Sequence, residues 1–235
     1  MKKEKELENR KNVLLFWSGD KDSAVSLFEL KSPEFHILGL LCFFDGSTER
    51  LQTQDVERSL IEAQAQALEL PLYSVFFSPQ PSNAEWIEKV GERIKEIRKT
   101  LRVDAVAFGD VQLGELRKWR ELVCDSLNLE AVFPISGWSP QLVQQAFFGL
   151  GHQAIVHCLD TKRIPPAFLG RPYNSSFVRD LPPQVDPGGE NGEFQTFVLD
   201  GPFFSSPLIL ESGALYEKNG FSYRELRLTS GPRAN

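Results

Sequence analysis

Val-Leu-Leu-Phe-Trp-Ser-Gly-Asp-Lys-Asp-Ser, residues 13–23, joins an apolar run to the start of a helical pattern through a short polar loop. This order predicts a buried strand that turns directly into an α-helix. Such a turn presents free backbone N–H groups and the positive end of a helix dipole at one point. The stretch therefore predicts an anion-binding site.

The side chains of this loop suit a polyphosphate. Lys21 supplies a positive charge, Ser18 and Ser23 supply hydroxyl donors, and Asp22 is a carboxylate of the kind that binds Mg²⁺. The Gly-x-x-x-x-Gly-Lys-Ser/Thr spacing is absent, so the loop is not a Walker A motif. The alternative interpretation is an ordinary strand–turn–helix connection with polar helix caps.

Composition narrows the class of protein. The chain has 235 residues, of which 41% are hydrophobic and 25% charged, and its net charge of −6 disfavours nucleic-acid binding through bulk charge. A local basic patch or a solvated helix face is expected at Arg117, Lys118 and Arg120. The N-terminal region has no secretory pattern and no apolar run approaches membrane-spanning length. We expect a cytoplasmic protein with no membrane partner.

Short apolar runs alternate with helical patterns through the first two thirds of the chain. Strands are expected at 13–17, 37–44, 72–77, 105–108 and 154–159, and helices at 56–67, 86–101, 116–127 and 141–148. Strands buried on both faces predict an α/β fold with a doubly wound parallel sheet. In such sheets ligands bind beyond the carboxyl ends of the strands, here after Trp17, Phe44 and Phe108.

The segment after residue 160 is richer in proline and glycine. Strands are expected at 194–199 and 208–211, with a hairpin through 223–229. These features predict two domains, a nucleotide-binding domain at 12–160 and a smaller C-terminal α+β subdomain on the substrate side at 161–235.

A second dense motif lies within this later segment, at residues 186–202. The run Gly188-Gly189-Glu190-Asn191-Gly192-Glu193 brings glycines that allow close backbone approach next to two carboxylates. Glu190 and Glu193 flank a turn, so they are expected to converge on a metal, an amine or an electrophile. The alternative is a glycine-rich hairpin with solvated acids.

Together these motifs resemble known families. The loop at 18–23 is similar to the Ser-Gly-Gly-x-Asp-Ser loop, or PP-loop, of the N-type ATP pyrophosphatases, which cleave ATP between its α and β phosphates. Over residues 12 to about 211 the chain resembles the diphthine–ammonia ligase family, including its bacterial relatives. The matching segments are Glu62–Leu68, Leu70–Leu72, Phe108–Val111, Arg117 to Cys124, Phe168–Arg171, Gly189–Phe194 and Asp200–Pro202.

The resemblance implies an adenine nucleotide alpha hydrolase-like fold and a ligase reaction. A substrate carboxylate attacks the α-phosphate of ATP, pyrophosphate leaves, and ammonia displaces AMP to form an amide. ATP and Mg²⁺ are the implied cofactors. Ammonia and a carboxylate-bearing substrate such as an elongation factor with diphthine are the implied partners, and a homodimer is a further expectation.

The resemblance also implies roles for named residues. Catalysis is expected from Lys21, Asp22, Glu190 and Glu193, with Asp22 as the Mg²⁺ ligand. Nucleotide contacts are expected from Ser18, Gly19, Lys21, Asp22, Ser23, Phe44, Gly109 and Asp110. Substrate contacts are expected from Arg117, Gly189, Glu190, Asn191, Gly192 and Glu193.

Four positions depart from the resembled pattern. Asp20 stands where the loop usually has glycine, Gln54 and Gln195 stand where related chains have histidine, and Gly188 stands where they have cysteine. A carboxylate about 4 Å from a phosphate charge costs roughly 4 kcal/mol at an effective dielectric near 20. We expect Asp20 to face solvent, the alternatives being a metal shared with Asp22 or an unpaired position in the loop.

These departures keep a second function open, namely a nucleotide-binding module that has lost ligase catalysis. Adenylation followed by a nucleophile other than ammonia is a weaker third interpretation, because the catalytic cysteines of thiolating enzymes have no counterpart here. Cys42, Cys124 and Cys158 are far apart and apolar in setting, so buried reduced thiols are expected.

Overall fold

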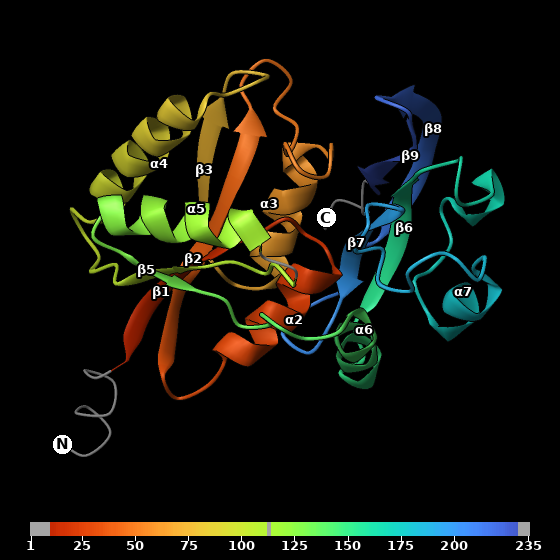
Figure 1. Cartoon of the computed structure of the whole chain (residues 1–235), viewed down its shortest axis with the longest axis horizontal. Helices are drawn as coiled ribbons and strands as arrows, with labels where there is room; N and C mark the ends of the chain where they lie inside the picture. The colour runs from red at the N-terminus through yellow and green to blue at the C-terminus, as the bar shows by residue number, and fades with distance from the viewer. Residues whose placement is uncertain (1–9, 112–113, 230–235) are drawn as a thin grey trace, which may run out of the picture.

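The computed structural model describes residues 10–111 and 114–229. The chain builds two sheets, which lie side by side in Figure 1. The first is a five-stranded parallel sheet and the second a four-stranded antiparallel sheet.

The parallel sheet has the strand order β3-β2-β1-β4-β5, which is doubly wound as predicted. Its strands are β1 (Lys11–Phe16), β2 (Phe35–Asp45), β3 (Leu72–Phe77), β4 (Ala105–Ala107) and β5 (Glu130–Val132). The helices between them are α2 (Lys21–Leu30), α3 (Arg58–Ala67), α4 (Asn83–Ile97) and α5 (Gly114–Ser126). Right-handed crossovers through these helices are what parallel pairing requires.

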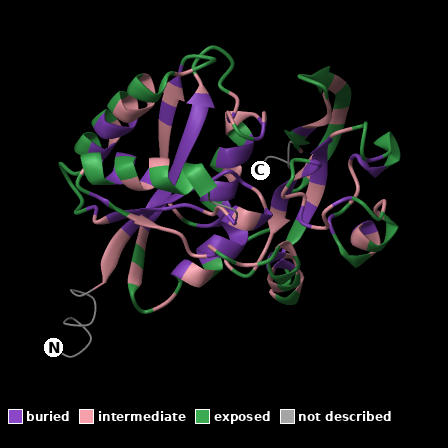
Figure 2. Cartoon of the chain, in the orientation of Figure 1, coloured by how far each residue is buried: buried purple, intermediate pink, exposed green. Residues whose placement is uncertain are grey.

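Both faces of the sheet are covered. Alternate residues of β1 point to opposite faces, so Val13 and Leu15 pack into one core cluster and Leu14 and Phe16 into the other. The first cluster includes the apolar faces of α2 and α3, and the second includes those of α4 and α5. In Figure 2 the central strands are purple and the outward helix faces are green.

One predicted strand belongs to the other sheet. Residues 154–159 were expected in the parallel sheet, but β6 (Gln153–Leu159) pairs antiparallel with β7 (Phe194–Asp200) and β9 (Phe221–Leu228). That expectation is wrong, because an apolar run reads the same whether its neighbours are parallel or antiparallel. The fifth parallel strand is β5, which is short and was not predicted. The two sheets therefore divide between Val132 and Gln153, whereas the two-domain division at residue 160 stays a prediction.

The antiparallel sheet has the order β7-β6-β9-β8 and ends in the hairpin of β8 (Leu210–Lys218) and β9. The helices around it are α6 (Pro140–Gly149), the 3₁₀ helix η1 (Pro166–Phe168) and α7 (Ser175–Asp180). In the described part of the chain, no helix is both long and apolar enough to cross a membrane.

Hydrogen bonds connect the two sheets at the loop after β1. The N–H of Val198 on β7 donates to the carbonyl of Gly19 over 2.8 Å, and the N–H of Lys21 donates to the hydroxyl of Thr196 over 3.2 Å. The side chain of Gln64 on α3 donates to the carbonyls of both Gly19 and Val198. The second sheet thus holds the loop that begins α2.

Candidate functional site

The loop between β1 and α2 is shaped by its glycine. Gly19 has φ of +78°, and a Cβ there would lie 2.6 Å from Oε1 of Gln64. Conformation and space therefore both require glycine at this position. The hydroxyls of Ser18 and Ser23 lie 2.6 Å apart, and the N–H of Ser18 donates to Ser23 Oγ. Both serines line the hollow beside the loop.

Asp20 is the N-cap of α2. Its Oδ1 accepts from the N–H of Ser23 over 2.9 Å, and its Oδ2 accepts from Nε2 of Gln54 over 3.0 Å. A carboxylate at this position satisfies a free N–H group and is stabilised by the helix dipole. The expectation of a solvent-facing Asp20 is wrong, because the cap and Gln54 hold both of its oxygens.

Lys21 is the buried cation of the loop, with a side chain 5% exposed. Its Nζ lies 2.6 Å from Asp22 Oδ2 and 2.8 Å from Glu190 Oε1. Burial lowers the pKa of a lysine, but the carboxylates of Asp22 and Glu190 outweigh it, so the pKa of Lys21 is raised. The ammonium therefore stays charged between the loop and the glycine-rich segment.

The acidic residues of the glycine-rich segment have different surroundings. Glu190 reaches Lys21, whereas Glu193 is 2% exposed and turns into its own loop. Glu193 accepts from the N–H of Asn191 over 3.0 Å and from the N–H of Asp186 over 3.3 Å, and Arg163 lies 3.6 Å away. Of the two predicted catalytic acids in this segment, the structure brings only Glu190 to the loop that begins α2.

The glycines of this segment allow a tight loop. Gly189 and Gly192 have φ of +72° and +76°, and a Cβ on Gly189 would lie 2.9 Å from the carbonyl of Phe194. Both glycines line the smaller of two adjoining hollows, with a volume of about 200 Å³. Asn191 is used within the loop, where its side chain also donates to Glu193.

The larger hollow, of about 340 Å³, opens beside the loop at the carboxyl end of β4. Its walls include apolar surface from Phe16, Val111 and Leu116. The two hollows share Asp20, Asp22, Gln54 and Glu190. A continuous space therefore runs past the N-terminus of α2, with an apolar side toward β4 and a polar side toward the glycine-rich segment.

Gly109 and Asp110, which were predicted to contact a nucleotide, line the larger hollow. A Cβ on Gly109 would lie 3.0 Å from Ser26 Oγ and 3.2 Å from the carbonyl of Asp22. Its close approach to α2 explains the glycine. Asp110 pairs with Arg120 at 2.7 Å, and the Arg120 guanidinium lies 4.2 Å from the centre of the Phe108 ring.

Two further predicted residues lie away from this space. Phe44 is fully buried in the core, where its ring packs against Phe76, and the structure does not bring it to either hollow. Arg117 has a side chain 46% exposed and pairs with Glu121 on the outer face of α5. The expectation of a solvated face holds for Arg117 and is wrong for Arg120, which is buried in the larger hollow.

The donor set of Asp22 fits a divalent cation. Its Oδ2 contacts Lys21, and its Oδ1 is buried without a hydrogen-bond partner. A buried carboxylate oxygen without a partner is costly unless a ligand occupies it. In the described ranges no cluster of three or more metal-ligating side chains is present, so further ligands would come from a phosphate or water.

Sequence reasoning missed several residues of the site. Gln54 comes from the loop before α3, Thr196 from β7 and His157 from β6. His157 is 1% exposed and its Nε2 donates to Oε1 of Gln54. Gln54 was visible as a departure from the resembled pattern, which was the available signal. Contacts between residues of different sheets cannot be recognised from the local spacing of residues in the sequence.

These features define a class. The chain is a doubly wound α/β protein in which the loop before α2 faces a glycine-rich acidic segment from a second sheet. The family comparison then identifies it further. The diphthamide synthase N-terminal domain matches residues 11–131 and its C-terminal domain matches residues 139–225, so the chain belongs to the diphthamide synthase family.

Relatives of similar length share this assignment. A diphthine–ammonia ligase from Bos taurus is 26% identical over 216 residues, covering 83% of this chain and 81% of the relative. One from Danio rerio is 24% identical over 228 residues, covering 83% and 84%. A solved chain from Methanocaldococcus jannaschii, described as a "predicted subunit of tRNA methyltransferase", aligns with a TM-score of 0.43 and 16% identity over 81% of this chain and 98% of that chain. That similarity is too remote to inform function.

Proposed function

We propose that the protein is an ATP-dependent ligase that adenylates a carboxylate and transfers ammonia to it. The observation that carries the proposal is Lys21, a charged ammonium held at the N-terminus of α2 between two carboxylates. Relatives named diphthine–ammonia ligase support the reaction class. The substrate is then a diphthine-like carboxylate, on an elongation factor where diphthine occurs.

The phosphates of ATP would lie along the loop from Ser18 to Ser23. Lys21 supplies the charge and the two serine hydroxyls supply donors. The N–H of Lys21 and that of Ser23 are already used, by Thr196 and Asp20. In the first turn the N–H of Asp22 has no partner among the described residues, so it remains for a phosphate oxygen.

Mg²⁺ would bind at Asp22, whose buried Oδ1 has no other partner, and would neutralise charge on the phosphates. The apolar wall of Phe16, Val111 and Leu116 suits the purine. This arrangement points the triphosphate from the larger hollow toward the smaller one.

The chemistry then has two steps. The substrate carboxylate attacks the α-phosphorus, the bond to the β-phosphate oxygen breaks, and pyrophosphate leaves toward Lys21. Ammonia attacks the carbonyl of the acyl-adenylate, a proton is lost, and AMP leaves. Glu190 would hold ammonium and take one proton from it to give ammonia once the pyrophosphate competes for Lys21, and the proton lost after the attack would pass to solvent.

A second function has a specific observation in its favour. Four carboxylates surround the space, from Asp20, Asp22, Asp110 and Glu190, and Lys21 is already neutralised by two of them. That arrangement also suits a module that binds a nucleotide and responds in conformation without turnover.

An isotope experiment separates the two functions. A diphthine-bearing substrate labelled with ¹⁸O in its carboxylate is incubated with ATP, Mg²⁺ and ammonium chloride. The ligase forms amide, releases pyrophosphate and moves one ¹⁸O into AMP, and Lys21→Met does none of these. Saturable ATP binding without pyrophosphate release on the labelled substrate would instead support the binding module.

A further inference from the structure

The orientation of Asp20 depends on one side chain from another part of the chain. Its Oδ1 is fixed by the cap of α2, but its Oδ2 accepts from Nε2 of Gln54 at 3.0 Å. Both residues line both hollows, so the carboxylate stands beside the groups expected to bind phosphate. Without the Gln54 contact, Oδ2 of Asp20 would have no hydrogen-bond partner among the described residues.

The side chain of Gln54 is itself held by a second residue. It is 6% exposed, and its Oε1 accepts from Nε2 of His157 over 3.0 Å. Burial lowers the pKa of His157 to about 3, so the imidazole is neutral and carries its proton on Nε2. The carboxylate, the amide and the imidazole form a chain in which each donor faces an acceptor, which fixes the amide with its NH₂ group toward Asp20.

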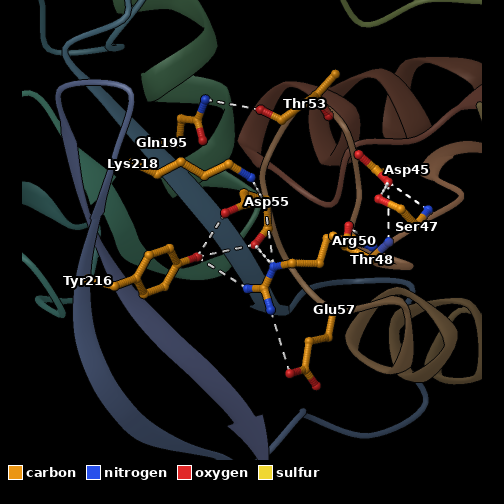
Figure 3. A network of polar contacts seen from close by, with 10 residues as sticks. All are labelled: Asp45, Ser47, Thr48, Arg50, Thr53, Asp55, Glu57, Gln195, Tyr216 and Lys218. Carbon is orange, nitrogen blue, oxygen red and sulfur yellow. Dashed lines mark hydrogen bonds and ion pairs between the residues drawn. The ribbon is translucent and has the colours of Figure 1, made fainter. Parts of the chain in front are cut away.

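The loop that carries Gln54 is fastened by the second sheet (Figure 3). Asp55 has φ of +52°, and its carboxylate accepts from Lys218 Nζ over 2.7 Å and from the hydroxyl of Tyr216 over 3.1 Å. Nε of Arg50 donates to the carbonyl of Asp55 over 2.8 Å. These contacts tie the loop before α3 to the tip of the β8–β9 hairpin.

A second tie lies on the other side of Gln54. Nε2 of Gln195 on β7 donates to the carbonyl of Thr53 over 3.1 Å. The backbone is therefore held immediately before and immediately after Gln54. Because its backbone is held on both sides and its Oε1 accepts from His157, Gln54 presents its amide in one orientation.

We propose that Gln54 is a positioning residue that keeps the Asp20 carboxylate on the helix cap and away from a bound polyphosphate. The β8–β9 hairpin fixes the loop from which Gln54 acts. The proposal rests on the proposed function in that the ligand is the triphosphate of ATP. It assigns to this amide the task of making a carboxylate compatible with an anion site.

A double-mutant cycle tests the coupling between the two residues. ATP·Mg²⁺ and AMP are titrated calorimetrically into wild type, Gln54→Met, Asp20→Asn and the double variant. Gln54→Met should weaken ATP binding about tenfold and change AMP binding by less than about twofold, since the freed charge faces the outer phosphates. Asp20→Asn keeps a good cap and removes the charge, so in that background Gln54→Met should change ATP binding by less than about twofold.

A neighbouring glutamine supplies the matched control. Gln52 lies on the same loop, is partly exposed and donates to the carbonyl of Ser78, so Gln52→Met should leave both affinities unchanged. Gln54→Ala is the second variant if Gln54→Met fails to fold, as judged by thermal unfolding.

Three outcomes overturn the proposal. Equal losses from Gln54→Met in both Asp20 backgrounds would make Gln54 a structural residue only, and tighter ATP binding would show that the released carboxylate assists the ligand. Wild type that binds AMP but not ATP·Mg²⁺ would overturn the proposed function together with this inference. The first two outcomes leave the proposed function intact.

Discussion

The loop that begins α2 and the glycine-rich segment are both short, glycine-containing and acidic, yet they are built differently. The loop at 18–23 is organised by its neighbours in sequence, through a cap from Asp20 and a hydroxyl pair of Ser18 and Ser23. The segment at 186–193 is organised from inside by Glu193, which gathers backbone N–H groups around a buried carboxylate. The loop at 18–23 is held by its cap and its hydroxyl pair, and the segment at 186–193 is held by hydrogen bonds to a buried carboxylate.

Because of this difference, one of two similar carboxylates stabilises its own loop and the other contacts a residue outside it. Glu193 has its hydrogen bonds within the loop, whereas Glu190 is left to face Lys21 across the boundary between the two sheets. The ion pair of Lys21 and Glu190 is where the two regions meet. The predictions that follow test which interactions belong to ligand binding and which to loop structure.

The largest effect is expected from Lys21→Met. The substitution removes the charge proposed to face the outer phosphates and leaves Asp22 and Glu190 without their shared partner. We expect ATP affinity to fall by about 100-fold or more and AMP affinity by less than about tenfold, the range for truncating a buried charged partner. Calorimetric titration of the two nucleotides measures both, and equal losses would show that Lys21 does not contact pyrophosphate.

The next effect concerns turnover. Glu190→Gln keeps an oxygen that can accept from Lys21 but removes the charge that would hold ammonium. Amide formation should fall by about 100-fold, a typical contribution of an acid–base group, while ATP affinity stays within about threefold. A saturation curve in ammonium at fixed ATP measures the change, and an unchanged rate would return Glu190 to a structural role.

Local motifs explain what could be predicted from the sequence and what could not. The strand, loop and helix at 13–23 were predictable because the determinants of an N-terminal anion site are adjacent in the chain. The buried face of α5 could not be predicted, since helical spacing places Arg117 and Arg120 three residues apart without indicating which of the two is buried. The sheet that receives β6 and the contact between Gln54 and Asp20 depend on long-range pairing, which a single sequence does not display.

Glu193→Gln provides the contrast with Glu190→Gln. The substitution keeps an acceptor but weakens charge-assisted bonds to two N–H groups and to Arg163. We expect a loss of about 2 kcal/mol in the free energy of unfolding, the usual scale for hydrogen bonds to a buried charge. Chemical denaturation measures it, with Glu190→Gln as the comparison expected to lose less, because Glu190 accepts a single hydrogen bond, from Lys21, and glutamine keeps an acceptor for it. Equal losses would remove the structural distinction between the two acids.

The last prediction is a pH dependence centred on Asp22. Burial, together with the carboxylates of Asp20 and Glu190, raises the pKa of Asp22 from 3.8 to about 7 against the opposing charge of Lys21. A raised folded-state pKa means that the folded protein binds more protons than the unfolded chain between these values. This group therefore stabilises the fold fully below about pH 4, and that contribution is lost as the pH rises through about 7.

Ligand binding should respond in the opposite sense, because Mg²⁺ binds the ionised carboxylate. With a pKa near 7, the ionised fraction of Asp22 rises about tenfold from pH 6 to pH 8, and Mg²⁺-dependent ATP affinity should rise by about the same factor. Asp22→Asn should flatten this profile, and ATP titrations at both pH values, with and without Mg²⁺, compare it with wild type. A profile that persists in Asp22→Asn would place the titrating group elsewhere, in ATP itself or in the glycine-rich segment. In either case the pH dependence would not come from the loop that begins α2.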